Sequence, residues 1–339
     1  MESLSLTFDD VLLVPSYNHY ESRRIVDTTS KDRTGKLTLQ LPVLSANMDT
    51  ITESGMAQFM SEYGGAGVLH RFMSIERNIE EFKKSPSSTF VSIGTSDAEL
   101  ERAKALSDAG ANYFCLDVAH AHSRYVGKTM KKLREMLPDA CIMAGNVATY
   151  AGADYLASLG ADIVKVGIGG GSVCTTRIKT GFGVPTLSSV KDCARIDRSI
   201  VADGGIRTPG DIVKALAFGA DFVMIGGMLA GTAPTPGKVI EVNGKKVKEY
   251  RGMASSEAQA DFLGKLPPWK TAEGVATYVN YRESQDEILA DIIGGLRSGL
   301  TYGGAATLRE LQRKLNYVQI SQAARIESLP HKTLRSDLS

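Results

Sequence analysis

The chain has 339 residues, a formal net charge of +1 and a pI near 7.6. This balance offers no basic surface for nucleic acid or for an anionic membrane, and no apolar run is long enough to span a bilayer. The four cysteines lack metal-type spacing, and the N-terminal residues have no signal-peptide pattern. We therefore expect a cytoplasmic protein with reduced thiols, without membrane or nucleic-acid partners.

Short apolar runs typical of buried strands recur along the first two thirds of the chain. The predicted strands cover residues 43–48, 67–70, 90–94, 113–117, 141–145, 163–166, 200–203 and 222–226. Amphipathic segments predict helices over residues 53–63, 97–109, 127–136, 150–159, 208–218, 287–297 and 305–314. Alternating strands and helices indicate an α/β fold with a parallel sheet. Eight strands favour a (β/α)8 TIM barrel over an open doubly wound sheet.

Glycines and polar residues follow nearly every predicted strand. Gly204 and Gly205 come after the seventh strand, and Gly226 and Gly227 after the eighth. In a barrel the C-terminal strand ends surround one active site, and phosphate is usually held after strands 7 and 8. Any single glycine pair could be only a tight turn, but consecutive glycine loops at these strand ends predict a phosphate pocket.

Cys174 lies in a glycine-rich run, Gly167 to Thr176, directly after the sixth predicted strand. Glycines there allow positive φ and close backbone approach, and the backbone N–H groups of such a loop can hold an anion. An isolated cysteine is more often a small buried residue. The four glycines, the serine and the threonines around this one favour a positioned thiolate nucleophile.

After the last predicted strand the pattern changes. Residues 239–250, with Asn243-Gly244 at their centre, predict a β-hairpin. Residues 251–270 are small, polar and proline-bearing, and we expect them to form a mobile flap that Trp269 anchors. His120 and His122, two positions apart after a strand, suggest a metal or a base, but a polar pair at a helix start is the favoured interpretation.

No linker divides the chain, so we expect one catalytic domain. This domain covers residues 1–320 and includes the hairpin and flap at about 237–282. The tail, residues 321–339, has little pattern and is expected to be partly disordered.

Five segments together resemble the family of inosine monophosphate dehydrogenase and guanosine monophosphate reductase over nearly the whole chain. They are residues 6–13 (LTFDDVLL), 46–50 (ANMDT), 167–176 (GIGGGSVCTT), 201–207 (VADGGIR) and 250–253 (YRGM). The resemblance implies a (β/α)8 barrel assembled as a homotetramer or octamer. Many of the dehydrogenases carry a regulatory (CBS) domain after the second strand. Phe90 follows closely on Arg71 here, so that insertion is absent.

The resemblance also implies covalent chemistry at C2 of a purine nucleotide, GMP or IMP. In the family a cysteine thiolate attacks C2 to give a thioimidate, and a hydride moves between C2 and a nicotinamide. Carried over by position, Cys174 is the nucleophile, Thr176 helps to activate ammonia or water, and Glu273 serves the ammonia step.

The remaining site residues are likewise implied by the resemblance. The substrate-binding positions are Ser172, Asp203, Gly204, Gly205, Gly226, Gly227, Tyr250, Gly252, Met253, Ala254 and Gly274. The cofactor-binding positions are Ser22, Arg23, Arg71, Asp117, Val118, Ala119, Ile168, Gly169, Ser298 and Thr301. Carbonyl oxygens of Gly169 and Gly171 would hold a monovalent cation, K⁺ in the family. Gly170 stands where the family usually has proline.

The segments that separate the two enzymes point in both directions. Residues 48–53 and 73–77 are more similar to the dehydrogenase. The dehydrogenase, however, needs an Arg-Tyr pair in its flap to activate water, and residues 253–273 contain neither arginine nor tyrosine. Ala272-Glu273-Gly274 and Lys179-Thr180-Gly181 resemble the reductase. This favours the reductase, which converts GMP to IMP and ammonia with NADPH in purine salvage.

Three alternatives stay open. A short-flap IMP dehydrogenase would oxidise IMP to XMP with NAD. An FMN-dependent barrel oxidoreductase would bind flavin phosphate with the same glycine loops, would be yellow, and would not need Cys174. A catalytically silent nucleotide-binding regulator is disfavoured by the intact Cys174, Thr176 and Glu273.

Overall fold

Parallel strands close into a barrel in the computed structural model, which describes residues 4–264 and 271–330. The strands are β4 (Val43–Ser45), β5 (Ala66–Leu69), β6 (Phe90–Ile93), β7 (Tyr113–Asp117), β8 (Cys141–Val147), β9 (Ile163–Val166), β10 (Ser199–Asp203) and β11 (Phe222–Ile225). Each pairs with the next in chain order, and β11 pairs with β4 to close the ring. The predicted (β/α)8 barrel and its eight strand positions are confirmed.

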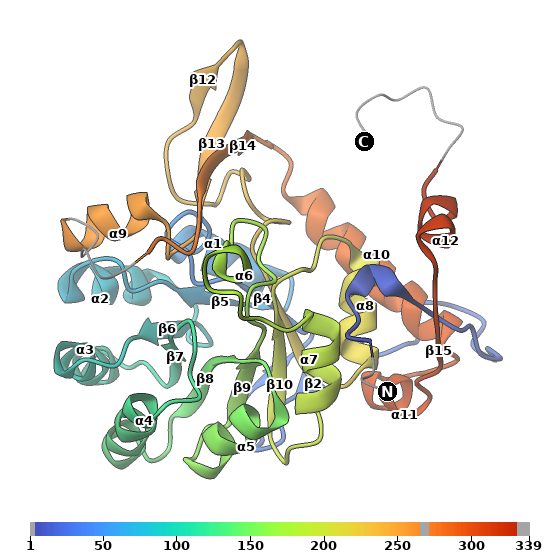
Figure 1. Cartoon of the computed structure of the whole chain (residues 1–339), viewed down its shortest axis with the longest axis horizontal. Coiled ribbons are helices and arrows are strands. Elements are labelled where there is room, and N and C mark those ends of the chain that lie inside the picture. The colour runs from blue at the N-terminus through green and yellow to red at the C-terminus, as the bar shows by residue number, and fades with distance from the viewer. Residues whose placement is uncertain (1–3, 265–270, 331–339) are drawn as a thin grey trace.

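Helices form an outer ring around the barrel (Figure 1). They are α1 (Ser54–Glu62), α2 (Ile75–Lys84), α3 (Asp97–Asp108), α4 (Arg124–Met136), α5 (Tyr150–Ser158), α7 (Thr186–Cys193), α8 (Pro209–Ala217), α10 (Asp286–Tyr302) and α11 (Leu308–Arg313). The short helix α6 (Thr176–Thr180) lies inside this ring, after the glycine-rich loop that follows β9 (Figure 1). Every predicted helical segment overlaps a helix of the ring. The sequence pattern does not predict α2, because this helix is mostly charged and buries only Asn78 and Phe82. Since α2 alone lies between β5 and β6, no regulatory domain is inserted there.

Side chains fill the barrel interior. Strands β5, β6, β9 and β11 are buried at every position, as expected for strands covered on both faces. Phe90, Phe222 and Leu44 belong to one buried cluster with Leu37 and Leu39, which come from the hairpin of β2 (Ser30–Lys31) and β3 (Thr38–Leu39). Each such side chain contributes about 1.5–3 kcal/mol through its burial.

A strand near the start of the described chain pairs with one near its end. β1 (Val11–Leu13) pairs antiparallel with β15 (Tyr317–Gln319), which the sequence pattern does not predict because both strands are very short. Part of the expected tail forms a helix, α12 (Gln322–Glu327), where Arg325 contacts Asp9 at 3.1 Å. Residues 331–339 lie outside the described part of the chain. Within residues 4–264 and 271–330, no helix has the length and apolarity needed to cross a membrane.

The predicted hairpin is confirmed and belongs to a larger sheet. β12 (Ile240–Val242) and β13 (Lys245–Arg251) flank Asn243 and Gly244, whose positive φ values of 51° and 73° suit a tight two-residue turn. β14 (Ala276–Asn280) pairs with β13 as a third strand, and the sheet projects from the barrel (Figure 1). The expected flap contains helix α9 (Ser256–Leu263). Residues 265–270, with Trp269, lie outside the described residues.

Candidate active site

The glycine loop after β9 lies directly against the loop after β10. A Cβ atom on Gly167 (φ +145°) would be 1.9 Å from the carbonyl oxygen of Asp203, and one on Gly204 (φ +91°) would be 3.1 Å from the nitrogen of Gly171. Glycine alone permits this approach together with positive φ. The loop that carries Cys174 is therefore held at the C-terminal face of the barrel, where enzymes of this fold have their active sites.

Cys174, Thr176 and Glu273 form a continuous hydrogen-bonded chain. The Cys174 thiol donates to Thr176 Oγ1 at 3.2 Å, and the Thr176 hydroxyl donates to Glu273 Oε2 at 2.8 Å. All three residues are partly exposed, so a ligand can reach them. The other three cysteines are buried, and burial raises the pKa of each thiol. Cys174 is therefore the cysteine that is suited to act as a nucleophile.

Backbone hydrogen bonds bring Glu273 to the catalytic loop. The Glu273 carbonyl accepts from the Thr175 N–H at 2.8 Å, and its own N–H donates to the Ala254 carbonyl at 3.0 Å. The next residue, Gly274, is buried, and a Cβ atom there would be 3.3 Å from the Val173 carbonyl oxygen. Backbone hydrogen bonds to Thr175 on one side and to Ala254 on the other thus hold the Glu273 carboxylate beside Thr176.

The predicted phosphate residues come together around one tyrosine. Tyr250 OH is 2.8 Å from Ser172 Oγ, and burial raises the pKa of this tyrosine, which keeps its hydroxyl protonated. Cβ atoms on Gly226 and Gly227 would each be 3.6 Å from the same hydroxyl oxygen. A Cβ atom on Gly205 (φ +81°) would be 3.6 Å from the carbonyl oxygen of Gly170 in the glycine loop. Exposed backbone at Gly227 and two hydroxyl groups form a cradle suited to a phosphate.

A buried lysine links the predicted ribose and cofactor residues. Lys165 Nζ is 3.0 Å from Asp203 Oδ2 and 2.8 Å from Asp117 Oδ1. Burial alone would raise the pKa of Asp117, but the Lys165 ammonium outweighs it and the pKa ends below its ordinary value. Asn146 Nδ2 also donates to Asp203 Oδ2, at 2.9 Å. Lys165 and Asn146 are missing from the predicted site; the available signal is a lysine inside the otherwise apolar strand β9.

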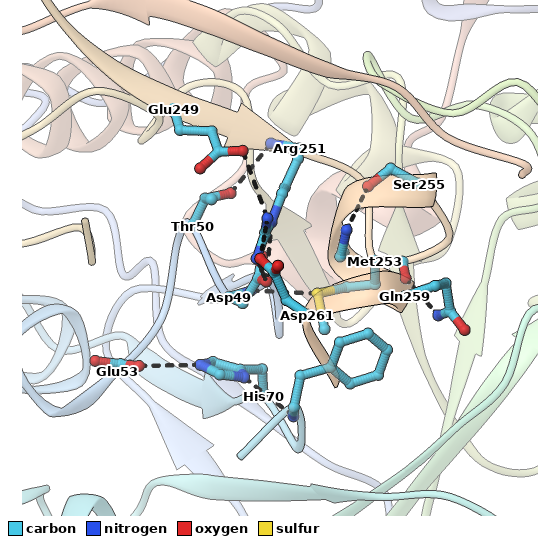
Figure 2. Close-up of polar contacts among 12 residues, drawn as sticks. Asp49, Thr50, Glu53, His70, Glu249, Arg251, Met253, Ser255, Gln259 and Asp261 are labelled. Carbon is cyan, nitrogen blue, oxygen red and sulfur yellow. Dashed lines mark hydrogen bonds and ion pairs between the residues drawn. The ribbon is translucent and has the colours of Figure 1, made fainter. Parts of the chain in front are cut away.

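Figure 2 shows Arg251, at the end of β13, between Asp49 and Asp261. Its Nη2 and Nε lie 2.7 and 3.0 Å from Asp49 Oδ2, and its Nη1 lies 2.7 Å from Asp261 Oδ2 on α9. The Asp49 N–H points to the sulfur of Met253 at 3.2 Å. Met253, a predicted contact of the base, is therefore fixed beside the loop after the first barrel strand.

Helix α9 is docked on the rim of the barrel. Phe262 stacks on Phe72 with ring centroids 4.5 Å apart and an interplanar angle of 8°. Ser255 caps the helix by accepting from the Ala258 N–H at 3.1 Å. Gln259 donates to the Met253 carbonyl at 2.8 Å (Figure 2). The described part of the expected flap is thus a helix with specific contacts.

The structure does not bring all the predicted cofactor residues together in one chain. Those at or next to the C-terminal strand ends are Arg71, Asp117, Val118, Ala119, Ile168 and Gly169. Ser22, Arg23 and Thr301 instead line a hollow of about 330 Å³, and Ser298 lines a neighbouring one of about 360 Å³. No residue of the catalytic loop lines either hollow. Within this chain the predicted cofactor residues therefore form two separate groups, and only the first lies at the C-terminal face of the barrel.

No structural observation establishes the predicted cation site. The Gly171 carbonyl accepts from the Cys174 N–H at 3.1 Å, so it already stabilises the catalytic turn. In the described ranges, no group of three His, Cys, Asp or Glu side chains is arranged to hold a metal. His120 and His122 are exposed just before α4, with ring centroids 6.5 Å apart.

An accessible cysteine, a threonine–glutamate pair and a glycine cradle after strands 7 and 8 are features expected of a barrel enzyme with a phosphorylated substrate. The chain belongs to the IMP dehydrogenase / GMP reductase domain family, whose model matches residues 5–331. It is therefore a purine nucleotide oxidoreductase of a family that uses a nicotinamide cofactor.

Relatives of both kinds are similar to the chain. GMP reductase of Yersinia enterocolitica is 40% identical over 335 residues, which cover 95% of this chain and 96% of that protein. A structure of inosine 5′-monophosphate dehydrogenase from Legionella pneumophila is 72% identical, with a TM-score of 0.87, and the match covers 94% of this chain and 99% of that one. A structure of GMP reductase from Trypanosoma brucei in complex with guanosine 5′-monophosphate is 28% identical, with a TM-score of 0.90 and 98% of each chain covered.

Proposed function

We propose that the chain is a GMP reductase, which converts GMP to IMP and ammonia with NADPH. The observation that carries the proposal is the chain of hydrogen bonds from Cys174 through Thr176 to Glu273, next to a segment, residues 253–273, without arginine or tyrosine. Hydrolysis of a thioimidate requires a base that activates water. This segment supplies no arginine–tyrosine pair for that step, whereas a glutamate can give a proton to a leaving amine.

In the first step Cys174 attacks C2 of the guanine. The thiol proton moves through the Thr176 hydroxyl to Glu273, and the C2–S bond forms. The C2–N bond then breaks, and the same carboxyl group returns the proton to the amine, which leaves as ammonia. The distances of 3.2 and 2.8 Å along this path are within reach of proton transfer. The result is a thioimidate on Cys174.

In the second step the thioimidate is reduced. The nicotinamide, when bound, supplies a hydride to C2. The C2–S bond breaks, the thiolate returns to Cys174 and IMP is formed. Asp203, which Lys165 and Asn146 hold in place, accepts from the ribose hydroxyls. Tyr250 and Ser172 hold the phosphate, so the purine stays in place between the two steps.

IMP dehydrogenase is the second candidate, and a specific observation favours it. The Legionella pneumophila structure, described as an inosine 5′-monophosphate dehydrogenase, is more similar in sequence, at 72% identity, than the GMP reductases at 40%. The same thioimidate would form from IMP by hydride loss to NAD, and Glu273 with Thr176 would then have to take a proton from water.

One experiment separates the candidates. Absorbance at the nicotinamide band is followed with GMP plus NADPH and, separately, with IMP plus NAD. Chromatography resolves the products IMP and XMP. Consumption of NADPH with equimolar ammonia release is the expected result. Steady formation of XMP from IMP, without GMP-dependent oxidation of NADPH, would establish the dehydrogenase instead.

A further inference from the structure

Lys248 is buried, and no described carboxylate pairs with it. Its ammonium donates to the carbonyl oxygens of Thr232, Ala233 and Thr235 at 3.1, 3.2 and 2.5 Å, and to Thr235 Oγ1 at 3.2 Å. The residue is 3% exposed, and no ion pair in the described residues involves it. These oxygens satisfy the hydrogen-bonding capacity of the buried ammonium, and the ammonium in turn holds the carbonyl groups in place.

Arg282, just after β14, contacts the same loop. Its Nη2 donates to the carbonyl oxygens of Met228 and Ala230 at 2.9 and 2.7 Å, and its N–H donates to the Gly231 carbonyl at 2.9 Å. Like Lys248, it has no carboxylate partner among the described side chains. Two cations from the projecting sheet therefore hold the carbonyl groups of residues 228–235, the segment that directly follows Gly226 and Gly227.

Lys248 and Tyr250 lie on the same face of β13, because side chains two apart in a strand point the same way. Tyr250 meets Ser172 and the backbone of Gly226 and Gly227. Strand β13 thus carries both Tyr250, which contacts the phosphate cradle, and Lys248, which contacts the loop that follows Gly226 and Gly227.

We propose that Lys248 and Arg282 are positioning residues for the nucleotide phosphate, which fix Gly226 and Gly227 against Tyr250. This inference rests on the proposed nucleotide binding but not on the choice between reductase and dehydrogenase. Because neither cation forms an ion pair with a described carboxylate, their positive charge also favours a phosphate bound at the loop.

The test compares Lys248→Met with Lys246→Met, which changes an exposed lysine of the same strand whose contact with Glu283 is 3.8 Å long. Calorimetry measures the Kd of IMP, and competition measures the Ki of inosine, which lacks the phosphate. For Lys248→Met we expect the Kd of IMP to rise about tenfold or more while the Ki of inosine changes less than about twofold. Lys246→Met should change neither. Equal weakening of IMP and inosine, or no weakening, would overturn the inference.

Chemical rescue tests the ammonium cage itself. Lys248→Ala removes the side chain beyond Cβ, and propylammonium matches the missing atoms. Propylammonium should restore the affinity for IMP in a saturable way, and tetramethylammonium, which cannot donate hydrogen bonds, should not. A Lys248→Ala protein that propylammonium does not restore, whether it is folded or not, argues against the role. A wild-type protein that binds no purine nucleotide would instead refute the proposed function.

Discussion

The hydroxyl of Thr176 donates to Glu273 Oε2 at 2.8 Å, although the two residues are 97 positions apart in the chain. Thr176 begins α6 directly after the catalytic loop, and Glu273 precedes β14. The Thr175 N–H donates to the Glu273 carbonyl, and the Glu273 N–H donates to the Ala254 carbonyl, which holds Glu273 in this place. In the proposed mechanism this contact gives the Cys174 thiol a path for its proton.

Glu273→Gln should separate the two half-reactions of the proposed reductase. Ammonia must leave C2 protonated, so loss of the carboxyl group should lower GMP deamination by about 10²–10⁴-fold. Hydride transfer from IMP to the oxidised cofactor needs no proton from this group and should fall by less than about tenfold. Rapid-quench analysis of ammonia and stopped-flow absorbance of the nicotinamide measure the two steps. Equal loss of both would contradict the assigned role.

Cys174→Ala should abolish turnover and leave nucleotide binding nearly intact. The covalent step is lost, but the phosphate cradle at Tyr250 and Ser172 does not include the thiol. We expect kcat to fall by at least about 10³-fold, while the Kd of IMP changes less than about threefold. Calorimetry and steady-state kinetics provide the two values. Cys193→Ala, which changes a buried thiol, is the control and should keep its activity.

The ion pairs of Lys165 should make stability depend on pH in two directions. The folded-state pKa of Asp117 is lowered from 3.8, so its stabilisation is present above that pH and is lost as pH falls further. The folded-state pKa of Lys165 is raised from 10.5, because the attraction of Asp117 and Asp203 outweighs burial, so its contribution is lost only above that pH. Asp117→Asn should therefore cost about 1–3 kcal/mol at pH 7, since Asp203 still pairs with the ammonium.

Urea unfolding of wild type and Asp117→Asn at pH 7 and at pH 3 checks this prediction. The difference in unfolding free energy should shrink at pH 3, because this pH lies below 3.8, the ordinary pKa, and the carboxylate of the unfolded chain then takes up a proton. A difference that is the same at both pH values would show that the ion pair is not its source.

The two carboxylates on Arg251 should differ in their value to stability. Asp49 and Arg251 are 11% and 13% exposed at the side chain, whereas Asp261 is 68% exposed. Asp49→Ala leaves a mostly buried guanidinium with poorer partners and should cost about 2–4 kcal/mol. Asp261→Ala removes an exposed partner and should cost at most about 1 kcal/mol. Urea unfolding gives both values, and a larger cost for Asp261→Ala would contradict the prediction.

Local patterns were sufficient for the barrel strands and for one turn. Runs such as Phe90–Ile93 and Phe222–Ile225 are apolar at every position and bounded by glycine or polar residues, which identifies buried parallel strands. Asn243-Gly244 predicts its hairpin turn because both residues adopt positive φ at low cost. The strands β1 and β15 could not be found in this way, since three residues of pairing leave no periodic signal.

The site was predicted in part, and the contacts that the sequence does not predict join residues far apart in the chain. The glycines before Cys174 and after the seventh and eighth strands indicate the catalytic loop and the phosphate cradle, because a loop needs glycine wherever another backbone approaches it. The role of Glu273 followed from family resemblance, and no local pattern places it beside Thr176. Lys165 appears in the sequence only as a lysine within an apolar strand.

The sequence by itself determined the strand positions and the places where glycine is required, because these depend on side-chain period and backbone sterics within a few residues. It also predicts Cys174 as the nucleophile. Tertiary structure alone decided which distant charges share a partner: Lys165 with Asp117 and Asp203, Arg251 with Asp49, and Lys248 with the carbonyl groups of residues 232–235. Burying a charge costs free energy unless oppositely charged or polar groups contact it. Barrel closure decides which groups these are, because it brings together strands that lie far apart in the chain.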